Sequence, residues 1–188
     1  MLRRCRLFCF WLILAGGGHA APELTAPGTV IMLRHAHAPG TGDPAGFDLA
    51  DARTQRNLDA RGRTQARELG RRLRAAGLAD ARVFTSEWHR CRETAALLAL
   101  GPVETLPALN SFFARPDDRV RLMAALHDWL RTRPPDAAPV VLVTHQVNIT
   151  ALTGHYPADA SGVVLQLNGT AQPRRVGLFP AGEDSMTR

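Results

Sequence analysis

The stretch Val30-Ile31-Met32-Leu33-Arg34-His35-Ala36-His37 decides the fold that we predict for this chain. Four apolar residues run directly into an arginine and a histidine, and Pro39 and Gly40 follow. A short apolar run bounded by turn-forming residues is typical of a buried strand in a parallel sheet. Open α/β sheets bind ligands beyond the carboxyl ends of such strands. We therefore expect Arg34 and His35 at a binding edge, where arginine can pair with a phosphate and histidine can attack one or relay a proton.

The composition is that of an ordinary globular protein, with 45% hydrophobic and 21% charged residues among 188. A chain of this length is expected to form one domain with a substantial core. Its formal net charge is +6, and every basic residue is an arginine. Because the arginines are spread along the chain and aromatic residues make up only 6% of it, we expect no nucleic-acid partner.

The first twenty residues have the pattern of a secretory signal. Three arginines lie within the first six residues, an apolar segment covers residues 7–15, and small residues stand at Gly18 and Ala20. We predict a signal peptide over residues 1–20, cleaved after Ala20, and a periplasmic or secreted mature protein without stable membrane insertion. The alternative is an uncleaved membrane anchor. The mature domain, residues 21–188, keeps a single cysteine, Cys91, which we expect to be buried and structural.

Hydrophobic periodicity along the rest of the chain predicts strands that alternate with helices. This order implies right-handed crossovers and an α/β three-layer sandwich, in which a mostly parallel central sheet has helices on both faces. The polar segment 38–57 is expected to be a loop that arches over the binding edge. In the helix after Asp117, we expect Val120, Met123, Leu126 and Leu130 to face the core. Strands are predicted at residues 29–33, 82–86, 103–109 (or an extended link), 140–144, 163–167 and 175–179, and helices at 58–76, 88–100, 117–131 and 147–152.

A second buried strand, residues 140–144, also ends in a histidine, His145. A third strand ends at Ser86, and Arg90 follows in the first turn of the next helix, whose amino terminus favours an anion. Two arginines, two histidines and a helix amino terminus at one sheet edge predict a phosphate pocket. His37 and His89 lie next to these positions in the sequence, so we count both as candidate substrate-binding residues.

Four segments resemble the histidine phosphatase (phosphoglycerate-mutase-like) superfamily, branch 1. They occur in the family's order and extend from Val30 to about Gly154, most of the mature chain. The first resembles the family's Arg-His-Gly signature, the second its helix start, the third its second-arginine segment, and the fourth its second-histidine strand end. They are Leu33-Arg34-His35-Ala36, Leu58-Asp59-Ala60-Arg61-Gly62-Arg63-Thr64-Gln65-Ala66, Thr85-Ser86-Glu87-Trp88-His89-Arg90-Cys91-Arg92-Glu93-Thr94-Ala95 and Val143-Thr144-His145-Gln146.

This resemblance implies a role for each matching residue. His35 would be the nucleophile that becomes phosphohistidine. Arg34, Arg90 and His145 would be catalytic with it and would bind the phosphoryl group. Ser86 is a further candidate substrate-binding residue because of its place at the end of the third strand, not because of the resemblance. No metal or other cofactor is implied, and the partner would be a small phosphorylated substrate.

The sequence departs from the family pattern at three places. Ala36 replaces a glycine, Glu87 replaces a proline, and Asn110 stands nearest to the glutamate that protonates the leaving group in the mutase-like branch. Asparagine cannot supply an acidic proton. Three explanations remain open: a loop carboxyl group (Asp43, Asp48 or Asp51) supplies the proton, the substrate has a good leaving group, or the site binds phosphate without turnover.

We predict an exported phosphatase that hydrolyses a phosphomonoester, such as a sugar phosphate, through a phosphohistidine intermediate. One alternative is a catalytically impaired phosphate-binding module. The other is a metal-dependent hydrolase that would use His35, His37 and His145 as ligands. Arg34 argues against this second alternative, because its charge would repel a cation.

Overall fold

Strand β1 (Thr29–Arg34) lies inside a six-stranded sheet, with β4 on one side and β5 on the other. The computed structural model describes residues 23–180, so the signal peptide predicted for residues 1–20 lies outside the described residues. The four apolar residues of β1 are fully buried. This burial on both faces explains why the strand is a continuous apolar run instead of an alternating one.

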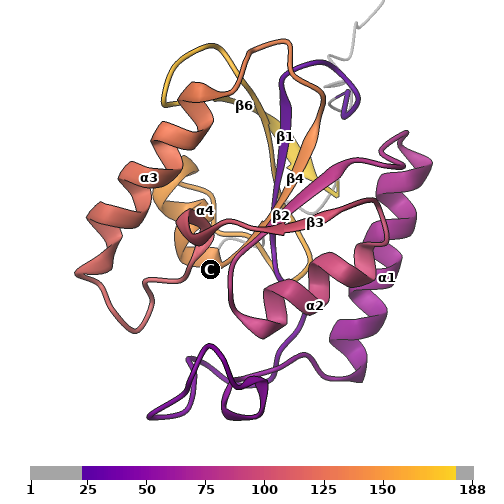
Figure 1. The fold of residues 1–188 in the computed structure, drawn as a ribbon. Helices are drawn as coiled ribbons and strands as arrows, with labels where there is room; N and C mark the ends of the chain where they lie inside the picture. The colour runs from indigo at the N-terminus through magenta and orange to yellow at the C-terminus, as the bar shows by residue number, and fades with distance from the viewer. Residues whose placement is uncertain (1–22, 181–188) are drawn as a thin grey trace, which may run out of the picture.

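The strand order is β3-β2-β4-β1-β5-β6 (Figure 1). Strands β3, β2, β4 and β1 are parallel to one another. Strand β5 pairs antiparallel with β1, and β6 pairs antiparallel with β5. This arrangement confirms the mostly parallel sheet. The strands other than β1 are β2 (Arg82–Thr85), β3 (Val103–Thr105), β4 (Val140–Thr144), β5 (Gly162–Gln166) and β6 (Arg174–Phe179).

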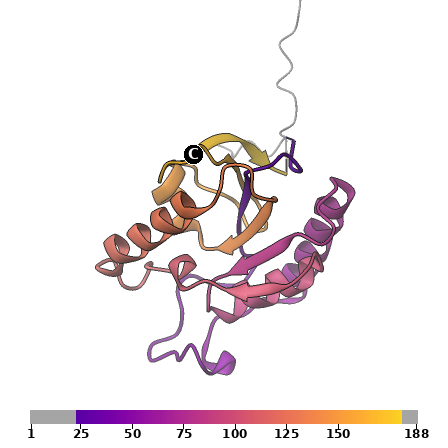
Figure 2. The ribbon, with the colours of Figure 1, turned by 45° about the horizontal axis from the view of Figure 1, so that its top comes forward.

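Helices cover both faces of the sheet, as Figures 1 and 2 show, so the three-layer α/β prediction is correct. One face carries α1 and α2, and the opposite face carries α3 and α4. Two 3₁₀ turns, η1 and η2, lie in the connections. These elements are α1 (Ala60–Ala75), α2 (His89–Leu98), α3 (Asp118–Thr132), α4 (Gln146–Thr153), η1 (Ala52–Thr54) and η2 (Pro107–Leu109).

The sheet separates two hydrophobic clusters, and β1 contributes alternate residues to each. Val30 and Met32 pack in the cluster with α3 and α4. Ile31 and Leu33 pack in the cluster with α1 and α2. Each of these side chains loses essentially all contact with water, which stabilises the fold by about 1.5–3 kcal/mol per residue. The central strand is thereby fixed, and its polar end is held at a defined edge.

Helix α3 differs from the prediction in one residue. Val120 was expected to face the core, but it is 80% exposed. The buried residues of α3 are Leu122, Met123, Leu126 and Leu130. Successive helical residues rotate by about 100°, so Val120 lies to one side of the stripe that these four residues define. The connection predicted at 103–109 divides into a short strand, β3, and the turn η2.

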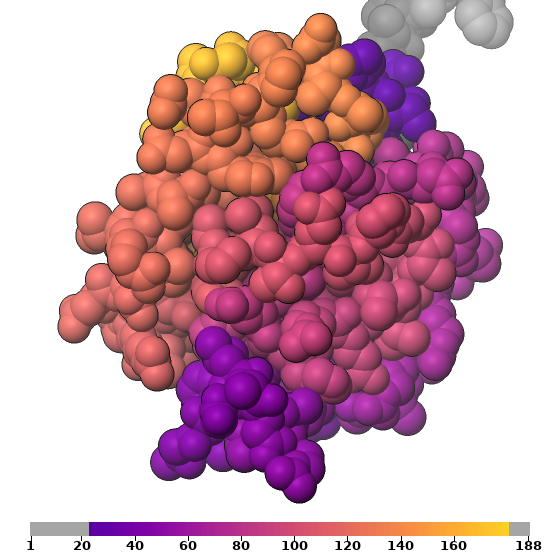
Figure 3. All heavy atoms as spheres, viewed as in Figure 1, coloured from indigo at the N-terminus to yellow at the C-terminus, as the bar shows by residue number. Residues whose placement is uncertain are grey.

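The segment 38–57 forms the predicted loop, and η1 interrupts it. In Figure 3 this segment is the indigo lobe that projects from the body of the molecule. In the described part of the chain, no helix is long and apolar enough to cross a membrane.

Candidate phosphoryl-transfer site

The parallel register of β1 and β4 brings the two predicted histidines together. Arg34 pairs with Thr144 across the two strands, so His35 and His145 follow at the same edge of the sheet. Their ring centroids are 5.5 Å apart, and the rings meet edge to face. Both side chains are buried. The sheet therefore supplies two neighbouring imidazoles at its carboxyl edge, as the sequence predicted.

The hydrogen bonds of His35 define which ring nitrogen faces the reactants. Its Nδ1 lies 2.8 Å from the carbonyl oxygen of Ala36, and Arg90 Nε lies 3.2 Å from its Nε2. A carbonyl oxygen only accepts, and an arginine N–H only donates, so Nδ1 carries the proton and Nε2 carries the lone pair. Burial, together with the charge of Arg90, lowers the pKa of His35 to about 3. His35 is therefore neutral at physiological pH, with a nucleophilic Nε2.

Arg90 lies at the start of α2, where it pairs with a carboxylate of the 38–57 loop. Its two terminal nitrogens reach the two oxygens of Asp43 at 2.7 and 3.2 Å. The side chains are only 3% and 6% exposed. Trp88 donates its indole N–H to the same carboxylate at 3.0 Å. The net effect of these contacts is to lower the pKa of Asp43. Burial alone would raise this pKa, but a larger opposite effect comes from the hydrogen bonds and charge of Arg90, with further contributions from the hydrogen bonds of Trp88 and the Arg56 backbone.

Arg34 is held from the other side of the site. It pairs with Asp159 at 2.9 Å and donates to the carbonyl oxygen of Pro157 at 3.1 Å. Its Nε is buried and has no hydrogen-bond partner among the described residues. An unpaired buried N–H of a charged group costs free energy, so this nitrogen is suited to an incoming anionic oxygen.

His145 is enclosed by Ser86, Trp88 and Cys91. Ser86 Oγ lies 2.8 Å from its Nε2, the Trp88 ring packs edge to face 5.2 Å away, and Cys91 Sγ lies 3.5 Å from Nε2. Burial, followed by the charge of Arg90, lowers the pKa of His145 well below its usual value. Burial also raises the pKa of the Cys91 thiol to about 12, which fits a structural cysteine and not a nucleophile.

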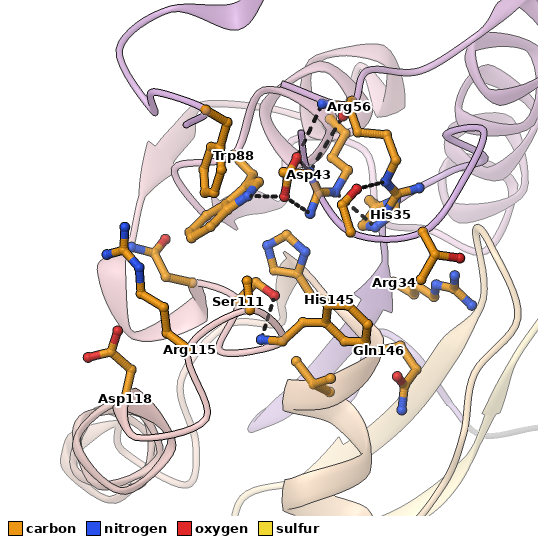
Figure 4. A pocket seen from close by; sticks show the side chains of 18 of the residues that line it. Arg34, His35, Asp43, Arg56, Trp88, Ser111, Arg115, Asp118, His145 and Gln146 are labelled. Atoms are coloured by element: carbon orange, nitrogen blue, oxygen red, sulfur yellow. Dashed lines mark hydrogen bonds and ion pairs between the residues drawn. The ribbon is translucent and has the colours of Figure 1, made fainter. Parts of the chain in front are cut away.

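These groups line one pocket, shown in Figure 4 with Arg34, His35 and Arg56 together on one side and Trp88 on the other. The loop residues and the segment before α3 complete its wall. The lining residues are Arg34, His35, Gly40, Thr41, Gly42, Asp43, Phe47, Leu49, Arg56, Trp88, Arg90, Asn110, Ser111, Phe113, Ala114, Arg115, Asp118, Arg121, Leu122, His145, Gln146, Val147 and Tyr156.

Three predicted binding residues do not line the pocket. The Nδ1 of His37 lies 2.9 Å from a carboxylate oxygen of Asp159, and His37 does not line the pocket with His35. His89 interacts with Asn57 at 3.0 Å. Ser86 contacts His145 from behind the pocket wall, so its place is to position that histidine.

The loop aspartates divide into one site residue and two turn residues. Asp43 lines the pocket, whereas Asp48 accepts from the Ala50 backbone N–H and Asp51 caps η1. The two turn residues have the ordinary role of aspartate in loops. Of the three predicted candidates, only Asp43 can reach a bound phosphate.

Asn110, where the resembled family has an acid, is fixed by hydrogen bonds. Its side-chain oxygen accepts from the Glu87 backbone N–H at 2.9 Å, and its side-chain nitrogen donates to the Glu87 carboxylate at 2.5 Å. Two of the three departures from the family pattern, Glu87 and Asn110, therefore contact each other. The carboxylate at Glu87 does not line the pocket.

Sequence reasoning missed Arg56, Trp88 and Asp159. Trp88 and Arg56 line the pocket, and Asp159 holds both Arg34 and His37. Trp88 stood inside a quoted segment, but the other two are isolated residues in loops and carried no local signal. Among residues 23–180, no three or more His, Cys, Asp or Glu side chains are grouped to hold a metal ion.

Comparisons with known proteins bear on this geometry. Residues 30–113 match the family model described as histidine phosphatase superfamily, branch 1. No curated protein matches the chain significantly. Among solved structures, SixA from Agrobacterium tumefaciens is 20% identical, covering 83% of this chain and 99% of its own, with a TM-score of 0.54.

Two further structures have the same fold. The protein histidine phosphatase SixA, in complex with tungstate, is 18% identical over 80% of this chain and 95% of its own, with a TM-score of 0.54. A phosphoserine phosphatase from Entamoeba histolytica, in complex with 3-phosphoglyceric acid, is 14% identical over 80% and 95%, with a TM-score of 0.53. At these identities the likeness concerns the fold alone. Residues 30–113 of this chain are thus similar to the histidine phosphatase superfamily (branch 1), and the chain shares the fold of these solved structures.

Proposed function

We propose that this chain is a phosphatase that transfers the phosphoryl group of a small phosphomonoester to His35 and then to water. The observation that best supports this proposal is the environment of His35 Nε2. This atom carries the lone pair of the ring, belongs to a residue that lines the pocket, and accepts a hydrogen bond from the guanidinium of Arg90 at 3.2 Å, which gives way when the lone pair attacks. A neutral nucleophile beside a cation that can bind the transferring group is what phosphoryl transfer to histidine requires.

In the first step, His35 Nε2 forms a bond to phosphorus while the bond from phosphorus to the leaving oxygen breaks. Arg34 and Arg90 neutralise the phosphoryl oxygens, and the buried Nε of Arg34 gains its missing acceptor. In the second step, water attacks phosphorus and gives up a proton to the carboxylate of Asp43, the bond from phosphorus to Nε2 breaks, and inorganic phosphate leaves. The lone pair of His35 is then restored.

The leaving oxygen needs a proton, and we assign this role to Asp43. In the free site its carboxylate is paired with Arg90, so it is ionised. When Arg90 binds the phosphoryl group, Asp43 loses its cation and faces an anion. Both changes raise its pKa, so the carboxyl group can take up a proton and donate it to the leaving group.

The substrate that we propose is a phosphomonoester of a small molecule, such as a sugar phosphate, met outside the cytoplasm. The signal-like pattern of residues 1–20 supports the compartment. Support for phosphatase activity comes from the family match and from neighbours whose names describe protein histidine and phosphoserine phosphatases. A substrate whose leaving group departs easily, including a phosphoramidate, fits the neutral amide at Asn110.

The experiment is to trap the phosphoenzyme. We expect rapid quenching with a labelled phosphomonoester to give an acid-labile, alkali-stable label on the wild-type chain, in EDTA as well as in buffer. His35→Asn removes the label and the turnover, whereas His127→Asn, a change in α3 outside the pocket, keeps both. Turnover by His35→Asn would refute the nucleophile. Activity that is lost in EDTA and restored by zinc would favour the metal alternative, and phosphate binding without any hydrolysis would favour the inert module.

A further inference from the structure

Arg56 lies near the end of the 38–57 loop and holds the first part of this loop in place. Its Nε donates to the carbonyl oxygen of Gly42 at 2.8 Å, and its Nη1 donates to the carbonyl oxygens of Ala38 and Gly40. Its backbone N–H donates to Asp43 at 3.1 Å. The Nη2 group has no hydrogen-bond partner among the described residues, so its two donors are available.

The guanidinium of Arg56 lies within the proposed phosphate site. It lines the same pocket as His35, and Figure 4 shows the two on one side of it with Arg34. Its charge contributes to the lowered pKa of both His35 and His145. Arg56 is thus close enough to act on a bound phosphoryl group.

The charges around the nucleophile do not balance. Arg34, Arg56 and Arg90 are balanced by two carboxylates, Asp43 and Asp159. Burial and the charge of Arg90 lower the pKa of Arg56, because its cation is partly desolvated beside another cation. A residue that only held loop carbonyls would not need a charge in this position, and an anion in the pocket would offset the repulsion.

We propose that Arg56 is a third phosphate-binding arginine, which uses Nη2 for the phosphoryl group while Nε and Nη1 hold the loop. Phosphate binding is then coupled to the order of residues 38–56, because the same guanidinium bonds to both. This inference rests on the proposed function for the location of the phosphate. It extends that function by one substrate-contacting residue and by a loop that responds to occupancy.

The test compares vanadate and inorganic phosphate binding in three variants. Arg56→Gln removes the charge, and Arg56→Lys keeps the charge without the forked donors. Gln55→Ala is the matched control, because Gln55 also holds the loop, through the carbonyl oxygens of Asp48 and Leu49 at 3.0 Å, but carries no charge and does not line the pocket. We expect Arg56→Gln to weaken both anions by about tenfold to a hundredfold, the effect of one hydrogen bond to a charged group. Arg56→Lys should have a smaller effect, and Gln55→Ala little.

Hydrogen exchange supplies a readout that does not depend on turnover. Vanadate should increase the protection of amides in residues 38–56 in the wild-type chain and in Gln55→Ala, but not in Arg56→Gln. Equal weakening of vanadate binding by Arg56→Gln and Gln55→Ala would overturn the inference and leave Arg56 as a loop anchor. A wild-type chain that binds vanadate but forms no phosphoenzyme would refute the proposed function without affecting this result, and one that binds neither anion would refute both.

Discussion

Replacing Asp43 with asparagine should separate two effects that the same carboxylate has on the reaction. The carboxylate accepts two hydrogen bonds from Arg90 and one from Trp88. The asparagine side chain would keep one acceptor oxygen but would lack the negative charge and the acidic proton. Binding of phosphate and protonation of the leaving group should therefore change in opposite directions.

The binding effect follows from competition for Arg90. In the free site, phosphate has to displace the carboxylate from a buried ion pair. We expect Asp43→Asn to tighten vanadate binding by about 1–2 kcal/mol, or roughly five- to thirtyfold, since hydrogen bonds to charged groups contribute about 1.5–3 kcal/mol and asparagine retains part of this.

The catalytic effect depends on the leaving group. General acid catalysis contributes about 10²- to 10⁴-fold, or about 3–5 kcal/mol of activation free energy. Asp43→Asn should lower kcat for alkyl phosphates by this factor and leave nitrophenyl phosphate nearly unchanged, because nitrophenolate departs without a proton. A series of aryl phosphates measures the dependence of the rate on leaving-group pKa, and this dependence should steepen in the variant.

The chain offers matched controls for this experiment. Asp48→Asn and Asp51→Asn alter exposed turn residues of the same loop, and both should leave the leaving-group dependence unchanged. A steep dependence that is already present in the wild-type chain and unchanged in Asp43→Asn would refute the acid role. It would favour a substrate that needs no acid. Weaker vanadate binding in Asp43→Asn would refute the competition for Arg90.

Two further predictions follow from the buried charges of the site. Arg90→Ala should lower kcat by about 10²- to 10³-fold and raise KM, and it should lower the free energy of unfolding by about 3–5 kcal/mol because it leaves Asp43 unpaired in a buried position. In thermal unfolding, the double variant Arg90→Ala/Asp43→Ala should recover stability without recovering activity; recovery of both would contradict the role of Arg90. The pKa of His35 is lowered to about 3 and that of His145 is also lowered, so below the unperturbed histidine pKa of about 6.5 the unfolded chain binds more protons than the folded chain. The free energy of unfolding should therefore fall as the pH decreases from about 6.5 toward 3, by up to about 1.4 kcal/mol per pH unit for each histidine. His35→Asn should flatten a plot of unfolding free energy against pH, and an unchanged slope would contradict the prediction.

The sequence predicted the parts of the fold that depend on local pattern. The apolar run of β1 and the apolar run of β4 are each short, continuous and followed by a histidine, and this pattern is enough to place His35 and His145 at one edge of a parallel sheet. The error at Val120 has the same origin, because a spacing of three residues fits a helical stripe but does not determine where the stripe is centred. Only packing against the sheet decides that.

The rest of the site depends on contacts between residues that are far apart in the sequence. Asp43 reaches Arg90 across 47 positions, and Asp159 reaches Arg34 across more than a hundred. Three aspartates in one polar loop are equivalent in sequence. The path of the loop, fixed by Arg56 and Gln55 through backbone carbonyls, decides that Asp43 turns inward while Asp48 and Asp51 form turns. No local pattern encodes such a path.

Asn110 and Glu87 give a physical reason why the acid would act from the loop. The resembled family has an acid near position 110 and a proline at position 87, whereas here an amide and a carboxylate are hydrogen-bonded to each other. The carboxylate stands behind the pocket wall, where it orients the amide and donates no proton to a substrate. A neutral group at position 110 does not repel phosphate as a carboxylate would. The leaving group must then receive its proton from another residue, one that becomes available only when the phosphoryl group binds Arg90 in its place. Asp43 meets that condition, so binding of the phosphoryl group would itself prepare the acid.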